Sequence, residues 1–195
     1  MILNDIPLFP LNTVLFPGGV LPLRIFETRY VDMVKRCMRD GSEFGIALIQ
    51  KGVEAGGDAA AHSVGTLARI VDFDQLPDKF LGITCRGTRR FKSLATHIQS
   101  DGLHRAKIEV LEPDPAIALP EEFVRYAELL QQALPQMGDY FKHLEVQYGD
   151  AAWVSGRLAE VMPIPLPEKQ KLLEIDDPLQ RLHVLQPLMH GEAPN

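Results

Sequence analysis

The chain has 195 residues, 46% of them hydrophobic and 24% charged, and a formal net charge of −6 at pH 7. A chain of this length can bury about 70% of its unfolded surface, so one domain or two small subdomains are both reasonable. The acidic balance weighs against a large non-specific nucleic-acid surface, although a local basic patch can exist within an acidic total.

Neither a membrane span nor a secretion signal is expected. No apolar run approaches the ~20 residues that a transmembrane helix needs. The N-terminus lacks the basic segment, apolar stretch and small-residue cleavage site of a signal peptide. Cys37 and Cys85 lie in apolar-patterned segments, which is typical of buried thiols in a reducing compartment. We therefore expect a soluble cytoplasmic protein.

The segment 7–30 combines four prolines with many large apolar residues. Proline fits poorly in central strands, so this composition predicts short, bent strand pieces at a sheet edge or rim that lead directly into a helix. Pro17-Gly18 suits the two central positions of a type II turn, where the second residue needs a positive φ.

The next residues predict one helix and then a series of strands. Apolar residues recur at helical spacing over 30–38, with Gly41 placed to end the helix. Strands are expected at 44–49, 64–76, 80–85, 91–98 and 103–111, and 51–63 is expected to be a loop. Asp101-Gly102 predicts a hairpin turn between the last two strands. The β-rich part is expected to end at residue 112.

The composition changes after residue 112. Three prolines in 113–120 predict a stiff, extended linker. From residue 121 onward, apolar stripes at helical spacing predict a small helical bundle, including a short helix over 141–148. The predicted organisation is α+β, with a β-rich subdomain over 1–112, a linker over 113–120 and a helical subdomain over 121–195.

Several blocks of the sequence together resemble a known family. The most specific are Pro7-Leu8-Phe9-Pro10-Leu11, Leu15-Phe16-Pro17-Gly18, Leu21-Pro22-Leu23, Ile25-Phe26-Glu27 and Arg29-Tyr30, and weaker ones begin at Gly65, Arg86 and Glu168. In this order they resemble the LON substrate-binding domain, the N-terminal domain of the ATP-dependent protease Lon. The resemblance covers nearly the whole chain. It implies a PUA-like β pseudobarrel with one helix, followed by a helical bundle.

Motifs for catalysis and for cofactor binding are missing from the sequence. None of the 15 glycines precedes a lysine, which excludes a P-loop, and no G-x-G pair is present for a dinucleotide fold. The sequence has no C-x-x-C, H-x-H or H-E-x-x-H pattern for a metal. We therefore expect no enzyme activity, no cofactor and no metal site.

The densest basic cluster consists of Arg86, Arg89, Arg90 and Lys92, with Phe91 among them. Arginine suits phosphate and an aromatic ring can stack on bases, so the cluster supports an alternative function in RNA binding. The competing interpretation is that some of these arginines form ion pairs inside the fold, with Glu27 as a candidate partner, because unpaired charges are rarely buried. We favour pairing inside the fold, and nucleic acid is not the expected partner.

The resemblance implies a non-catalytic module that binds peptides or unfolded protein segments. Apolar residues beside the Pro17-Gly18 turn cannot all point inward, and an exposed subset would form an apolar patch. The predicted contacts are Phe16, Leu21 and, in the linker, Ile117. Edge-strand pairing with an extended chain would add backbone hydrogen bonds. The competing interpretation packs these residues under the helices. The expected partner is a polypeptide segment or a protein, and the oligomeric state stays open.

Overall fold

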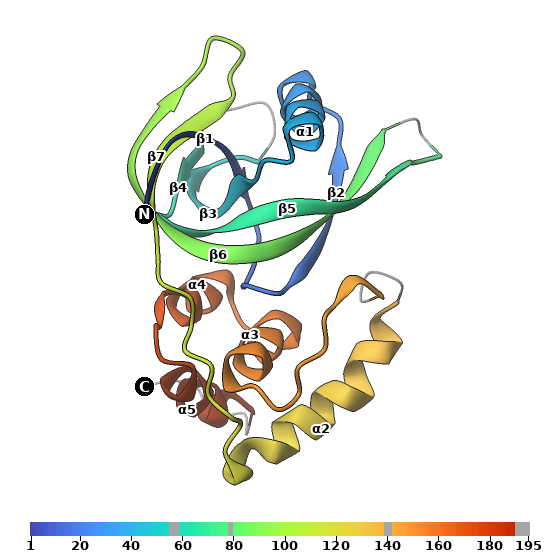
Figure 1. The fold of residues 1–195 in the computed structure, drawn as a ribbon, viewed down its shortest axis with the longest axis vertical. Coiled ribbons are helices and arrows are strands. Elements are labelled where there is room, and N and C mark those ends of the chain that lie inside the picture. The colour runs from blue at the N-terminus through green and yellow to red at the C-terminus, as the bar shows by residue number, and fades with distance from the viewer. Residues whose placement is uncertain (55–58, 78–79, 139–141, 190–195) are drawn as a thin grey trace.

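The computed structural model describes residues 1–54, 59–77, 80–138 and 142–189. Strands dominate its N-terminal part and helices follow (Figure 1). The strands are β1 (Ile2–Leu11), β2 (Val20–Ile25), β3 (Phe44–Gly52), β4 (Ala59–Ala61), β5 (Val64–Gln75), β6 (Leu81–Ile98) and β7 (His104–Val110). The helices are α1 (Thr28–Asp40), α2 (Val124–Ala133), α3 (Ala151–Val161), α4 (Leu166–Glu174) and α5 (Pro178–Met189), with 3-10 turns at Glu121–Phe123 and Leu134–Met137. The predicted α+β class is confirmed at this level.

All seven strands belong to one mixed sheet with the order β1-β7-β6-β5-β3-β4. β1 also pairs in parallel with β3, so the pairings run in a closed circuit through five strands. β2 lies off this path and pairs with β6. In Figure 1, α1 lies on the side of the sheet that is remote from α2–α5.

β6 is one long strand of 18 residues, where the sequence predicted two separate strands at 80–85 and 91–98. Its first part pairs with both β2 and β5, and its last part pairs with β7. The segment 7–30, which we call the opening segment, approaches this strand closely at Gly87. A side chain would prevent the approach, because a Cβ at Gly87 would lie 2.4 Å from the Phe16 carbonyl oxygen. The backbone N–H groups of Gly18 and Gly87 both donate to carbonyl oxygens across this contact.

The opening segment turns at Pro17-Gly18 as predicted, but Pro7 and Pro10 lie within β1, a continuous strand of 10 residues that pairs with both β7 and β3, and not in short strand pieces at a sheet edge. Gly18 has a φ of 75°, and the N–H of Gly19 donates to the Phe16 carbonyl at 3.0 Å, which closes the turn. α1 then buries Tyr30, Met33, Val34 and Cys37 of its predicted apolar stripe, whereas Met38, which was also predicted to belong to it, is 40% exposed. It ends at Gly41, whose φ of 61° is the left-handed conformation that glycine adopts at a helix C-terminus.

The core has three clusters of buried side chains. One lies between α1 and the sheet, a second lies within the sheet near Phe91, and the third joins the helices to the opening segment. Phe16 belongs to the third cluster and is completely buried, with its ring against Gly156 of α3. Sheet and helices therefore share one continuous apolar contact.

Two segments differ from the sequence-based expectation. β4 forms within the predicted loop 51–63, where residues 55–58 lie outside the described part of the chain. Residues 144–147 have no helical conformation, although a short helix was predicted over 141–148. Phe141, the first residue of that predicted helix, also lies outside the described residues. The segment is instead tied to the sheet by Arg86, whose guanidinium donates to the Glu145 carboxylate and to the His143 carbonyl.

Candidate functional site

Three phenylalanines are exposed around β2 and the hairpin formed by β5 and β6. The exposed fractions are 55% for Phe26, 59% for Phe73 and 38% for Phe80. The rings of Phe26 and Phe80 have centroids 6.0 Å apart, and the guanidinium of Arg24 lies 4.7 Å from the centre of the Phe80 ring. Large apolar side chains that gather on a surface mark an interaction site more strongly than scattered ones do. Phe73 alternates along β5 with Asp72 and Asp74 and lies opposite the buried Ile83, so its side chain is on the other face of the hairpin from theirs. We use the name aromatic patch for Phe26, Phe73 and Phe80, of which Phe26 and Phe80 are in ring contact.

Hollows lie beside this patch on both sides of β2. One, of about 320 Å³, is lined by residues of β2, β5 and β6 that include Phe73, Leu76 and Gly82. The other, of about 330 Å³, lies between β2, β1 and α1 and includes Phe26 and Tyr30. Both are lined by Pro22, Leu23 and Arg24 of β2. Phe73 and Phe80 border a further hollow of about 350 Å³.

The local sequence explains why these hollows exist. Pro22 lies opposite Thr84, and Arg24 lies opposite Gly82 in the register of β2 and β6. Gly82 has no side chain, so the space next to Arg24 on this face is not filled by β6 itself. The Leu76 side chain comes within 3.0 Å of where a Cβ of residue 82 would lie. The hairpin of β5 and β6 projects beyond the rest of the sheet in Figure 1. Phe73 lies near the end of β5 and is 59% exposed.

β2 is paired with β6 and with no other strand in the described part of the chain. Its free edge can in principle accept an extended chain. Pro22 lies in the middle of this strand and has no backbone N–H, which limits backbone pairing there and protects the edge from aggregation. Side-chain anchoring in the hollows is therefore the better-supported mode of contact.

The structure places the predicted peptide contacts away from this surface. Phe16 is completely buried, so none of its side chain is available to a ligand. Leu21 is partly buried against the cluster beneath α1, and Ile117 is partly buried against the helices. The Ile117 carbonyl also accepts a hydrogen bond from the N–H of Ala151 at 2.9 Å, which fixes the linker to α3.

The predicted basic cluster is divided between the interior and the surface. Arg90 is 3% exposed, whereas Arg89 and Lys92 are exposed to solvent. Arg86 holds the segment around Glu145 through an ion pair. The expected partner Glu27 binds Arg29 instead, at 2.8 Å. Because Arg90 is buried, these four residues do not form one continuous basic surface.

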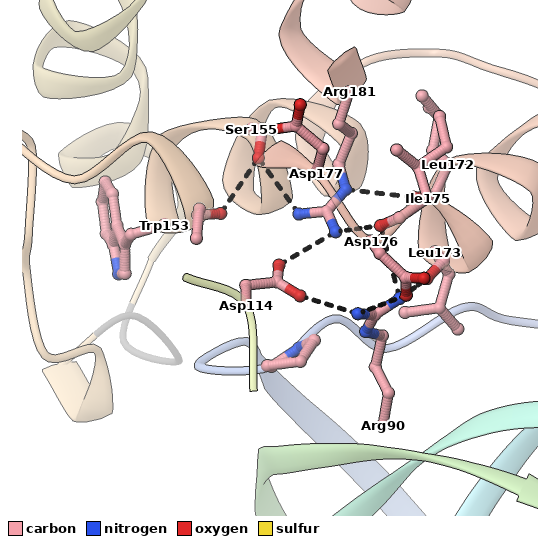
Figure 2. Close-up of polar contacts among 12 residues, drawn as sticks. Arg90, Asp114, Trp153, Ser155, Leu172, Leu173, Ile175, Asp176, Asp177 and Arg181 are labelled. Carbon is pink, nitrogen blue, oxygen red and sulfur yellow. Dashed lines mark hydrogen bonds and ion pairs between the residues drawn. The ribbon is translucent and has the colours of Figure 1, made fainter. Parts of the chain in front are cut away.

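Arg90 belongs to a buried polar network between the sheet and the helices (Figure 2). The Asp114 carboxylate lies 2.9 Å from the guanidinium of Arg90 and 2.9 Å from that of Arg181, and these two side chains are 3% and 1% exposed. Arg181 also donates to the Ser155 hydroxyl and to two backbone carbonyls. Burial lowers the pKa of the Arg181 guanidinium, and the charge of Asp114 opposes this shift. The network holds the linker, β6 and α5 together.

A second polar contact joins α3 to the opening segment. Arg157 pairs with Glu160 at 2.7 Å and donates to the Pro17 carbonyl at 3.1 Å. The Glu160 carboxylate accepts the backbone N–H of Phe16 at 3.1 Å. This contact and the buried Phe16 fill the interface between the opening segment and α3, so a ligand cannot enter there.

No arrangement for catalysis or metal binding is found in the described ranges. Both cysteines are buried and free, and burial raises the pKa of the Cys85 thiol to about 12. A thiol with so high a pKa is a poor nucleophile. Within residues 1–54, 59–77, 80–138 and 142–189, no three histidine, cysteine or acidic side chains are placed to hold a metal ion. Among the helices described, none is long and apolar enough to cross a membrane.

The chain belongs to the family of the ATP-dependent protease La (LON) substrate-binding domain, whose model matches residues 5–191. It is similar in structure to the Lon N-terminal domain protein from Xanthomonas campestris, with a TM-score of 0.76, 38% identity and coverage of 94% of this chain and 98% of that one. The family predicted from the sequence blocks is confirmed.

Full-length relatives extend far beyond the matched region. Lon protease of Anaeromyxobacter dehalogenans is 26% identical over 95% of this chain, which corresponds to 23% of that protein. Lon protease of Escherichia coli K12 is 29% identical over 96% of this chain and 25% of its own length. The chain therefore spans about a quarter of the curated relatives that it matches.

Proposed function

We propose that this protein is a non-catalytic module that binds polypeptide segments through the aromatic patch and the two hollows beside β2. The family is named for substrate binding, and its matched region covers residues 5–191. The observation that carries the proposal is the exposure of Phe26, Phe73 and Phe80 next to hollows of about 320–350 Å³. This volume suits one or two apolar side chains of an extended chain.

In this proposal, the β-rich part carries the binding site and the helical part supports it. We assign residues 1–112 to a PUA-like pseudobarrel, on the basis of the closed circuit of strand pairings, and residues 121–195 to a helical subdomain joined by the linker 113–120. The helical subdomain stiffens the sheet through the network of Arg90, Asp114 and Arg181. A stiff scaffold lowers the cost of binding because little of the site must be ordered. The two buried free thiols are compatible with action in the cytoplasm.

The proposal is tested by binding to a reduced, unfolded model polypeptide. Fluorescence anisotropy is measured for the wild type and for the double variant Phe26→Ser/Phe73→Ser. Loss of aromatic anchors costs about 1–3 kcal/mol, so we expect an affinity reduced by roughly 5- to 100-fold. Because the contacts are apolar, affinity for a neutral segment should change little between low and high salt, unlike binding to phosphate.

The matched control is Leu94→Ser. Leu94 is 48% exposed on the last part of β6, outside the hollows beside β2. This variant removes a similar apolar surface and should leave affinity unchanged. Equal affinity of the double variant and the wild type, with both folded by circular dichroism, would refute the proposed site. Absence of binding to any unfolded polypeptide would refute the proposed function.

A further inference from the structure

The hollows beside β2 have acidic rims. Glu27 and Glu54 line the hollow next to α1, and Asp72 and Asp74 line the hollow on the outer face of β2, β5 and β6. Arg24 is the one basic residue that lines these two hollows. Four carboxylates therefore surround an apolar surface in a chain whose net charge is −6.

Two of the four carboxylates are neutralised within the fold. Glu27 forms an ion pair with Arg29 at 2.8 Å. Asp72 lies 3.1 Å from His143 Nε2 and 3.7 Å from Lys142 Nζ. Because these two carboxylates pair with the protein's own basic side chains, they attract a cationic ligand only weakly.

The other two carboxylates have only neutral partners among the described residues. Glu54 accepts one hydrogen bond, from the Asn12 amide at 3.3 Å. Asp74 accepts the backbone N–H of the following residue, Gln75, at 2.8 Å. Neither forms an ion pair within the described residues, and each borders a different hollow. The guanidinium of Arg24 lies over the Phe80 ring, 4.7 Å from its centre.

We infer that this site, if it binds polypeptides as proposed above, selects segments in which an aromatic or branched aliphatic residue is flanked by lysine or arginine. The apolar side chain enters a hollow, and the cation lies beside Glu54 or Asp74. A segment rich in glutamate or aspartate is rejected because its charges face two carboxylates that form no ion pair with any described residue and lie next to an apolar surface. Selection by attraction of one sign and repulsion of the other is a common basis of binding specificity.

The test uses three short fluorescent peptides that share a central Leu-Phe-Leu and differ in having lysine, serine or glutamate on both sides. Titrations are done at low and at high salt with the full chain. At low salt we expect the lysine peptide to bind about 10-fold more tightly than the glutamate peptide, with the serine peptide in between. High salt should bring the three affinities together, since exposed charges are screened.

The double variant Glu54→Gln/Asp74→Asn isolates the role of the two carboxylates. It should reduce the advantage of the lysine peptide over the serine peptide to less than about 2-fold, as the ratio of the two affinities measured on the same variant. The matched control is Glu122→Gln/Glu128→Gln, which removes two exposed carboxylates near and on α2 and should keep the charge preference.

The outcomes distinguish failure of the charge selection from failure of polypeptide binding. If all three peptides bind with equal affinity at low salt, the charge selection is overturned and the polypeptide-binding function stands. If the control variant loses the preference as fully as the Glu54 and Asp74 variant does, the preference comes from net charge and the assigned residues are wrong. If none of the three peptides binds, the proposed function and the selection both fail.

Discussion

The network of Arg90, Asp114 and Arg181 gives the sharpest prediction about stability. Asp114→Asn removes the negative charge between two guanidiniums that are almost completely buried. Removing one partner of a buried ion pair costs about 3–5 kcal/mol, because the remaining charges stay in a poorly solvated site. We expect the lower end, about 3 kcal/mol, since both arginines keep their hydrogen bonds to backbone carbonyls.

The assay is equilibrium unfolding in urea, followed by circular dichroism. With an m-value of about 2–3 kcal/mol/M, the predicted loss lowers the urea midpoint by roughly 1–1.5 M. The control is Asp176→Asn, which also pairs with Arg90, at 3.0 Å, but has a side chain that is 88% exposed. Exposed pairs contribute about 0–1 kcal/mol, so this midpoint should change little. Equal losses in the two variants would show that burial of the network does not stabilise the fold.

Three further predictions concern local features. The Cys85 thiol, whose pKa is raised to about 12, should resist a thiol reagent at pH 8 and react only when the chain is unfolded; rapid labelling of the native protein would contradict its burial. The hydrogen bond from Arg105 holds the pKa of Asp5 below its ordinary value. The stabilisation from Asp5 is therefore complete above about pH 4 and is lost as the pH falls through the lowered pKa. Because Asp5 is more than half exposed, Asp5→Asn should cost less than ~1 kcal/mol at pH 7, and this difference should shrink as the pH falls below the ordinary pKa of aspartate; a constant difference would contradict the assignment. Arg86→Ala should increase amide hydrogen exchange in 142–149 and leave the urea midpoint nearly unchanged; unaltered exchange would mean that other contacts hold this segment.

The sequence was most informative where structure depends on neighbouring residues. The glycines at 18, 41 and 102 all have positive φ values, as their predicted turn and helix-end positions require. Four of the five residues predicted for the apolar stripe of α1 are buried and only Met38 is exposed, because a helix of 13 residues presents one face at regular spacing. These features follow from local backbone geometry and side-chain periodicity.

Long-range charge pairing could not be predicted in the same way. Arg90 was grouped with its sequence neighbours, but its partners Asp114 and Asp176 lie in the linker and before α5. The sequence around an arginine does not show whether its guanidinium binds phosphate or pairs with a buried carboxylate. The isolated Asp114 between prolines in the linker was the available signal, because a charged residue in a stiff, apolar segment needs a partner.

The residues predicted to contact a peptide differ from the aromatic residues that are exposed in the structure. An exposed apolar surface near the opening segment was expected, yet Phe16 is covered by α3 and the exposed rings belong to Phe26, Phe73 and Phe80. Exposure depends on where the core ends, which strand periodicity does not reveal. For Phe73, the flanking Asp72 and Asp74 were a usable signal, since two carboxylates beside an aromatic residue favour a strand end near solvent.

The central claim is that residues beside β2 bind polypeptide segments, and nuclear magnetic resonance tests it most directly. Amide chemical shifts of the labelled protein are recorded while an unfolded polypeptide is added. The account predicts that the largest changes fall in 22–27, 72–76 and 80–84, with little change in α2 and α5. Changes confined to α2–α5, or no changes at a saturating concentration of polypeptide, would contradict it.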